Sequence, residues 1–274
     1  MSKTIFITGA SKGFGKLWAK AFLKRGDRVI ATARKITDLD DLIATYGDLV
    51  FPYQMDVNNR AEVFKTVEDA ANVTGNIDVL INNAGFGLFG TTEETTEEQA
   101  RAQMETNFFG SLWVAQAILP VFRKQKNGHV IQISSFLGLT TLPMLGLYNA
   151  SKFAVEGLIE TISSEVAHLG IKTTLIEPNG FSTDWSGASA VQTPSTITDY
   201  DPVRDAFEAA GSNPDNWGIP VATVQPLLDV VDMIQPPKRL LFGKVAYHTI
   251  HDVLNHRLKE VEEWKTVSLA AHGH

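Results

Sequence analysis

Short apolar runs alternate along the chain with longer segments in which apolar residues recur at a helical spacing. Strands are predicted at Thr4–Thr8, Arg28–Ala33, Leu49–Gln54, Ile77–Asn82, His129–Ser134, Lys172–Glu177 and Arg239–Phe242. Helices are predicted at Phe14–Arg25, Leu39–Tyr46, Arg60–Val73, Thr96–Arg123, Leu147–Leu169, Pro202–Ala210, Pro220–Ile234 and Val245–Trp264. The interior strands are nearly continuous in apolar residues, as in strands buried on both faces. The pattern predicts a doubly wound α/β fold with a mostly parallel seven-stranded sheet and helices on both faces.

The strand–helix alternation stops after Glu177. The next forty residues are rich in Ser, Thr, Gly, Asp and Pro, and such a long irregular stretch is typical of a functional lid or of disorder. We therefore predict one domain over residues 1–274, with a variable substrate-binding cap at about 181–220 and a C-terminal helical extension at about 245–274.

Composition excludes several classes of protein. The net charge is −7 and no basic stripe is present, so we expect neither a nucleic-acid partner nor attraction to an anionic membrane. Without cysteine there can be no disulfide, thiol nucleophile or Cys-ligated zinc. The spacing of His248, His251 and His256 along a helix does not bring all three to one point, so no metal site is predicted. With no long apolar run and no signal-peptide pattern, we expect a cytoplasmic location.

A glycine-rich turn, Gly9-Ala10-Ser11-Lys12-Gly13-Phe14-Gly15, joins the first predicted strand to the first helix. Glycines there permit a tight turn, close approach of a pyrophosphate and close packing of the helix on the strand. The helix N-terminus adds unpaired N–H groups and a partial positive charge. The turn therefore predicts a nucleotide phosphate site, although a purely structural turn is the alternative.

The spacing Gly9-x-x-x-Gly13-x-Gly15 resembles that of the short-chain dehydrogenase/reductase family rather than the common dinucleotide motif. Three further motifs match the family in the same order. Asn82-Asn83-Ala84-Gly85 closes the fourth strand, Tyr148-x-x-x-Lys152 opens a helix, and Pro178-Asn179-Gly180 follows the sixth strand. The match covers about residues 3–183, and Asn179 is a departure because the family usually has Pro-Gly at this point.

The resemblance implies a nicotinamide cofactor, and charge favours NADP(H). The second strand ends at Arg34 without the acid that holds the ribose hydroxyls of NAD, whereas Arg34 can bind a 2′-phosphate bidentately. Lys12 resembles the second basic residue of NADP-preferring members, and the alternative is that both residues are solvated surface charges. The expected cofactor-binding residues are Gly9, Ser11, Lys12, Gly13, Phe14, Gly15, Arg34, Asp56, Val57, Asn83, Ala84, Gly85, Tyr148, Lys152, Pro178, Gly180, Phe181 and Thr183.

Tyr148 and Lys152 lie four residues apart on a predicted helix, so their side chains share one face. Such pairs are common, but a nearby ammonium favours phenolate and should lower the tyrosine pKa toward the working pH of an acid–base catalyst. The family's catalytic serine lies thirteen positions before the tyrosine, which selects Ser135 over Ser134. Asn107 resembles the family's helix-kinking asparagine, which binds a water of a proton relay; the alternative is a satisfied core amide.

The resemblance implies an NADPH-dependent carbonyl reductase, reversible as an alcohol dehydrogenase, that forms a homodimer or homotetramer. The substrate would be a small-molecule carbonyl compound or alcohol. A rival interpretation is a non-catalytic NADP(H)-binding sensor or scaffold. Apolar residues near the predicted catalytic rim and in the cap suggest a hydrophobic or aromatic substrate; they are Phe86, Leu88, Phe136, Leu137, Leu142, Met144, Leu145, Trp185 and Trp217.

Overall fold

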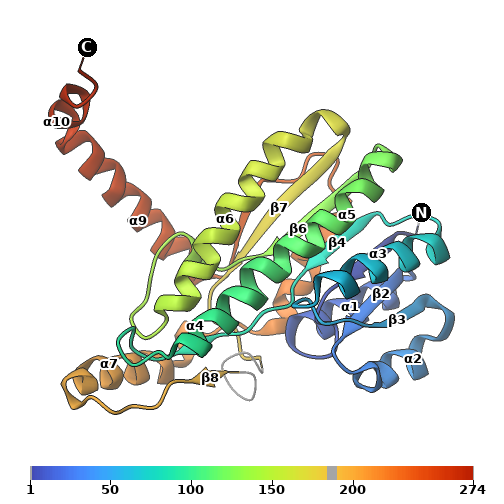
Figure 1. Ribbon diagram of the computed structural model, residues 1–274, viewed down its shortest axis with the longest axis horizontal. Coiled ribbons are helices and arrows are strands. Elements are labelled where there is room, and N and C mark those ends of the chain that lie inside the picture. The colour runs from blue at the N-terminus through green and yellow to red at the C-terminus, as the bar shows by residue number, and fades with distance from the viewer. Residues whose placement is uncertain (1, 184–189, 274) are drawn as a thin grey trace.

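The computed structural model describes residues 2–183 and 190–273, and its centre is a seven-stranded sheet (Figure 1). The strands lie in the order β3-β2-β1-β4-β6-β7-β9, and every pairing between neighbours is parallel. Their bounds are β1 (Thr4–Ile7), β2 (Arg28–Ala33), β3 (Val50–Gln54), β4 (Val79–Asn82), β6 (Gly128–Ile133), β7 (Ile171–Pro178) and β9 (Arg239–Phe242). The expected doubly wound α/β fold is confirmed, with a sheet that is wholly parallel.

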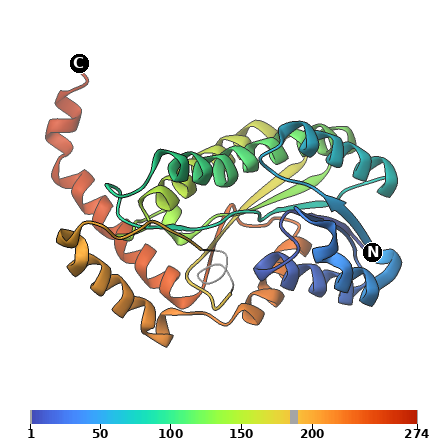
Figure 2. The same ribbon diagram turned by 60° about the horizontal axis from the view of Figure 1, so that its bottom comes forward.

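Helices cover both faces of the sheet, as Figure 2 shows. One layer contains α1 (Gly13–Arg25), α2 (Asp40–Tyr46) and α8 (Val224–Asp232), and the other contains α3 (Arg60–Thr74), α5 (Ser111–Gln125) and α6 (Gly146–Val166). The side chains of β1 pack against both helix layers in turn, because successive strand residues point to opposite faces of the sheet. Ile5 and Ile7 are buried against the first layer, and Phe6 is buried against the second.

The helix predicted at Thr96–Arg123 is interrupted in the structure. It consists of α4 (Glu97–Met104), a π-helical turn at Glu105–Gly110, and α5. A π-turn inserts one extra residue into the helical repeat and is frequent at functional sites. Asn107 lies inside this turn.

The cap contains structure that the sequence pattern did not predict. Strand β5 (Leu88–Phe89) pairs in parallel with β8 (Val191–Gln192), a hundred residues later, to form a second two-stranded sheet. Helix α7 (Asp201–Ser212) follows, where the sequence pattern did predict a helix, at Pro202–Ala210. Trp185, expected at the substrate pocket, lies outside the described residues.

The C-terminal extension consists of α9 (Lys244–Glu263) and α10 (Lys265–Ala270). Figure 1 shows α9 leaving the body of the protein, so that its second half and α10 stand away from the sheet. No helix within residues 2–183 and 190–273 combines the length and the apolar character that crossing a bilayer requires.

Candidate active site

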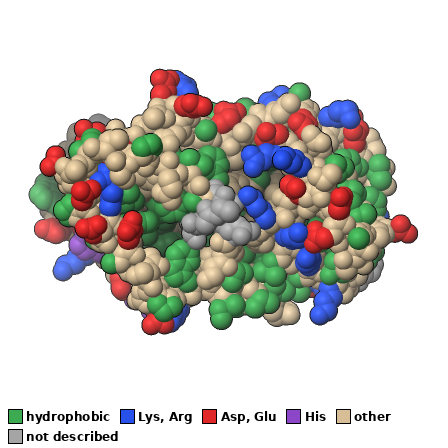
Figure 3. All heavy atoms as spheres, turned by 90° about the horizontal axis from the view of Figure 1, so that it is seen from below, with side chains coloured by type: hydrophobic (Ala, Val, Ile, Leu, Met, Phe, Trp, Pro, Cys, Tyr) green, Lys and Arg blue, Asp and Glu red, His purple; other side chains and the backbone are tan. Residues whose placement is uncertain are grey.

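A cavity of about 850 Å³ lies at the carboxyl ends of the strands, where the glycine-rich turn, the N-terminal end of α6 and the cap meet. Figure 3 shows the molecule from the side of the cap, where hydrophobic side chains lie in a hollow. All of the expected cofactor-binding residues except Gly15 line this cavity, and so do Ser135, Tyr148 and Lys152. The structure therefore brings the motifs that are scattered along the sequence to one place.

The glycine-rich turn needs glycine for steric reasons. Gly9 has a positive φ of 67°, and a Cβ there would lie 3.2 Å from Nδ2 of Asn83. A Cβ on Gly15 would lie 2.2 Å from the carbonyl oxygen of Gly9, so only glycine lets the first turn of α1 pack against the glycine-rich turn. Gly15 therefore has a packing role and does not line the cavity. Asn83 Nδ2 donates to the carbonyl oxygen of Thr8 at 2.9 Å, which ties the turn to the end of β4. This cradle of backbone groups fits a dinucleotide pyrophosphate.

Lys12 follows β1 and Arg34 follows β2, which lie across β4 from β6 in the sheet, so these residues are on the side where the adenosine half of a dinucleotide would bind. Both side chains are exposed, both line the cavity, and neither forms an ion pair with the residues that the structure describes. Two cations that have no carboxylate partner in the described chain are available to an anionic ligand.

Helix α6 presents Tyr148 and Lys152 to the cavity, and the end of β6 presents Ser135. All three are buried, with 6%, 7% and 5% of their surface exposed. Lys152 Nζ donates to the carbonyl oxygen of Ile133 at 2.9 Å and lies 5.7 Å from the centre of the Tyr148 ring. The Ser135 hydroxyl is hydrogen-bonded to Tyr148 and accepts from the Leu137 N–H at 3.1 Å. The three side chains form one connected group.

The electrostatics of this group differ from the sequence-based expectation. Burial raises the pKa of Tyr148, and the hydrogen bond with Ser135 opposes this only in part. Burial also lowers the pKa of Lys152 to about 8, although the Glu156 carboxylate works in the opposite direction. The expected lowering of the Tyr148 pKa is therefore wrong for this structure, because desolvation of the phenolate by burial outweighs the hydrogen bond from Ser135.

Asn107 does not line the cavity but supports its wall. Its Oδ1 accepts from the Phe86 N–H at 3.1 Å, and its Nδ2 donates to the Phe86 carbonyl at 3.0 Å and to Ser151 Oγ at 3.1 Å. The amide thus joins the segment after Asn83-Ala84-Gly85 to α6 at Ser151, the residue directly before Lys152. These bonds agree with the alternative of a satisfied core amide, and the proton-relay role stays a prediction.

The other end of the cavity is apolar. The expected Phe86, Phe136, Leu137, Leu142, Leu145 and Trp217 line it, together with Phe89, Ala190, Val191, Phe207, Ala210 and Val245. The placement of Leu88 in this wall was wrong, because adjacent strand residues point in opposite directions and Phe89 is the one that faces the cavity. Met144 does not line it either; its positive φ of 66° marks a turn. The charged residues of the described lining, Lys12, Arg34, Asp56 and Lys152, all belong to the cofactor end or the catalytic group.

Sequence reasoning missed two groups of charged residues. Buried Glu156 and Glu177 form a cluster with half-buried Arg239 behind Lys152, and Glu94 and Arg204 form an ion pair between the core and the cap. The members of each group come from elements far apart in the chain, and no local motif marks them.

The fold and the site together define a dinucleotide-binding oxidoreductase with a Ser–Tyr–Lys group at the end of a parallel sheet. The comparisons with known proteins agree: the chain belongs to the short chain dehydrogenase family, whose model matches residues 3–193. It is 38% identical to "Oxidoreductase BOA17" of Botryotinia fuckeliana, over 99% of this chain and 100% of that one. It is 33% identical to "NADPH-dependent 3-dehydrocapnine reductase" of Ornithobacterium rhinotracheale, over 80% of each chain. The crystal structure of a short-chain dehydrogenase from Streptomyces avermitilis superimposes with a TM-score of 0.91, at 33% identity and over 98% of both chains.

Proposed function

We propose that the protein is an NADPH-dependent carbonyl reductase that also runs in reverse as an alcohol dehydrogenase. The observation that carries the proposal is the position of Ser135, Tyr148 and Lys152. They lie in one cavity between a pyrophosphate cradle on one side and an apolar chamber on the other. A carbonyl group in the chamber would be within reach of the Tyr148 hydroxyl while the rest of the substrate contacts apolar side chains.

Lys12 and Arg34 are exposed and have no ion-pair partner among the described residues, which supports a preference for NADP(H) over NAD(H). A guanidinium can bind the 2′-phosphate through two hydrogen bonds, and the second strand ends without the carboxylate that would repel it. A relative described as NADPH-dependent, at 33% identity, supports the same choice.

The residues of the chain would divide the chemistry among them. A bound nicotinamide supplies the hydride that reaches the carbonyl carbon. Tyr148 gives its hydroxyl proton to the carbonyl oxygen, and Ser135 donates a hydrogen bond that stabilises the charge developing there. Lys152 has a pKa of about 8 and is therefore cationic at neutral pH. Its positive charge stabilises the phenolate that forms when Tyr148 gives up its proton. In the oxidative direction Tyr148 takes the alcohol proton.

The test is NADPH oxidation over a panel of ketones and aldehydes, from small to steroid-sized, with NADH alongside. Tyr148→Phe should lower kcat about 10²- to 10⁴-fold, the usual contribution of general acid catalysis, while the variant still binds NADPH. Tyr53→Phe, which removes a hydroxyl outside the cavity lining, is the matched control. Near-normal turnover by Tyr148→Phe would contradict the mechanism. NADPH binding without turnover of any carbonyl compound by the unaltered protein would favour the sensor interpretation.

A homodimer or homotetramer and a cytoplasmic location also stay predictions. Association is supported by the part of α9 and α10 that stands away from the body, which exposes Leu254, Leu258, Val261, Trp264, Val267 and Leu269 (Figure 1). Light scattering on the purified protein measures the number of subunits directly.

A further inference from the structure

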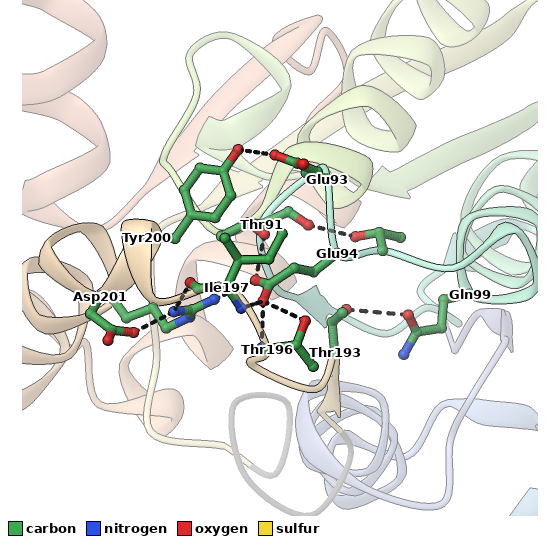
Figure 4. Close-up of polar contacts among 11 residues, drawn as sticks. Thr91, Glu93, Glu94, Gln99, Thr193, Thr196, Ile197, Tyr200 and Asp201 are labelled. Carbon is green, nitrogen blue, oxygen red and sulfur yellow. Dashed lines mark hydrogen bonds and ion pairs between the residues drawn. The ribbon is translucent and has the colours of Figure 1, made fainter.

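Glu94 lies in the loop between β5 and α4 and accepts hydrogen bonds from the cap through both carboxylate oxygens (Figure 4). Its Oε1 accepts from the N–H groups of Thr196 and Ile197, at 2.6 and 2.8 Å, and from Thr196 Oγ1 at 3.2 Å. Its Oε2 accepts from Thr91 Oγ1 at 2.6 Å and forms an ion pair with Arg204 of α7. The Glu94 side chain is only 3% exposed, and that of Arg204 is 11% exposed. A single carboxylate therefore satisfies donors from two segments of the cap.

The same region of the cap is docked closely against the core at other points. A Cβ on Gly90 would lie 2.4 Å from the Cβ of Thr193, so the two backbones approach as near as a glycine permits. Thr193 Oγ1 donates to Gln99 at 3.3 Å, and Tyr200 donates its hydroxyl to Glu93 at 2.6 Å (Figure 4). The ion pair thus lies at the centre of a polar interface that fixes the cap.

Helix α7 connects this interface to the apolar chamber. Arg204, Phe207 and Gly211 are three and four residues apart and so share one face of the helix. Phe207 and Gly211 line the cavity, and the Phe207 ring packs edge-on against Phe89 with 6.2 Å between ring centres. Because Arg204 is held by Glu94, the position of Phe207 depends on that contact.

We propose that Glu94 and Arg204 are positioning residues that hold α7 as a fixed wall of the substrate chamber and thereby select for large apolar substrates. The proposal rests on the proposed reductase function. A large substrate would contact Phe207 and gain affinity only while that wall is held in place. A small ketone would be bound by the catalytic group without reaching α7, so its kinetics should not depend on the ion pair.

Glu94→Gln removes one acceptor oxygen and places an N–H₂ group against donors from Thr196 or Arg204. Glu93→Gln is the matched control, since it makes the same change in charge at the neighbouring, exposed position and its side-chain oxygen can still accept from the Tyr200 hydroxyl. For Glu94→Gln we expect the KM of a large apolar ketone to rise about tenfold or more, as loss of hydrogen bonds to a charged group produces. The kcat for that ketone and the kcat/KM of a small ketone should stay within about twofold of the unaltered protein.

Amide hydrogen exchange provides a readout that does not depend on turnover. In Glu94→Gln, exchange should accelerate in residues 193–212 while β1 and β4 stay protected, and Glu93→Gln should match the unaltered protein. Arg204→Met breaks the pair from the other side and should reproduce both effects, which separates loss of the contact from misfolding of one variant. Equal KM values and equal exchange for the variants at positions 93 and 94 would overturn the proposal. If the unaltered protein reduces no carbonyl compound, the proposed function fails, and the exchange result alone decides whether the pair fixes the cap.

Discussion

The buried carboxyl pair behind Lys152 makes stability depend on pH in a way that can be calculated. Glu156 on α6 and Glu177 on β7 both contact Arg239 on β9, Glu177 at 3.2 Å, and their side chains are only 5% and 1% exposed. Burial raises the pKa of both carboxyl groups, and repulsion by Glu156 contributes to raising that of Glu177 to about 8. One arginine cannot balance two buried carboxylates, so the pair holds one proton at neutral pH.

That proton is lost on unfolding, where a glutamate has its ordinary pKa of 4.5. The folded state therefore binds one proton more than the unfolded state between pH 4.5 and about 8, and its stability falls as pH rises. The slope is about 1.4 kcal/mol per pH unit, which gives about 2 kcal/mol between pH 6.5 and 8. Buried His129, with its pKa lowered to about 3, opposes this slope mainly below its ordinary value of 6.5. Lys152 contributes only above about pH 8.

Glu177→Gln replaces the protonated acid by a neutral group of the same shape that can donate to Glu156 and accept from Arg239. Urea unfolding at pH 6.5, 7.0, 7.5 and 8.0 should show stability falling by about 2 kcal/mol in the unaltered protein and a flat profile in Glu177→Gln. Glu160→Gln is the control, because exposed Glu160 bonds the same arginine at 3.0 Å and its loss should leave the slope unchanged. Equal slopes in the unaltered protein and Glu177→Gln would refute the shared proton.

Two further predictions follow from single contacts. Arg34→Asp should weaken NADPH binding about tenfold or more and leave NADH binding nearly unchanged, because the new carboxylate would repel the 2′-phosphate that we propose Arg34 binds. Titration of both nucleotides measures this, with Lys35→Asp as the neighbouring control, and equal weakening of both would remove Arg34 from that role. Gly128→Ala should lower stability by about 1–3 kcal/mol, because its Cβ would lie 2.2 Å from the Phe122 ring; an unchanged melting temperature would show that the ring can move away.

The sheet and the cofactor half of the site were predictable because their determinants are local. Strands buried on both faces leave continuous apolar runs, and all seven main strands were placed to within a few residues. The cofactor end of the site is built from the segments directly after these strands, so chain order alone places Arg34, Asn83 and Ser135 at one edge of the sheet. Steric need explains the glycine spacing, as the clash of any side chain at Gly15 with the Gly9 carbonyl shows.

The substrate half was not predictable because its determinants lie far apart in the chain. Strands β5 and β8 have two residues each, too few to show a period, and each exists because the other pairs with it across a hundred residues. The choice of Phe89 over Leu88 in the cavity wall depends on that pairing. Likewise, nothing near Glu94 in the sequence distinguishes it from exposed Glu93, Glu97 and Glu98, since all four read as acids at the start of a helix.

The charge of Lys152 depends on both local and distant parts of the sequence. Its place four residues after Tyr148 follows from the helix, but burial alone would favour the neutral amine. Two features oppose that loss: the Ile133 carbonyl accepts from Nζ, and Glu156, one turn further along α6, attracts the ammonium group. Glu156 can do so only while it is ionised, which requires Arg239 from β9 and a proton on Glu177 from β7. The last strand of the sheet thus contributes, through one arginine, to keeping Lys152 positively charged.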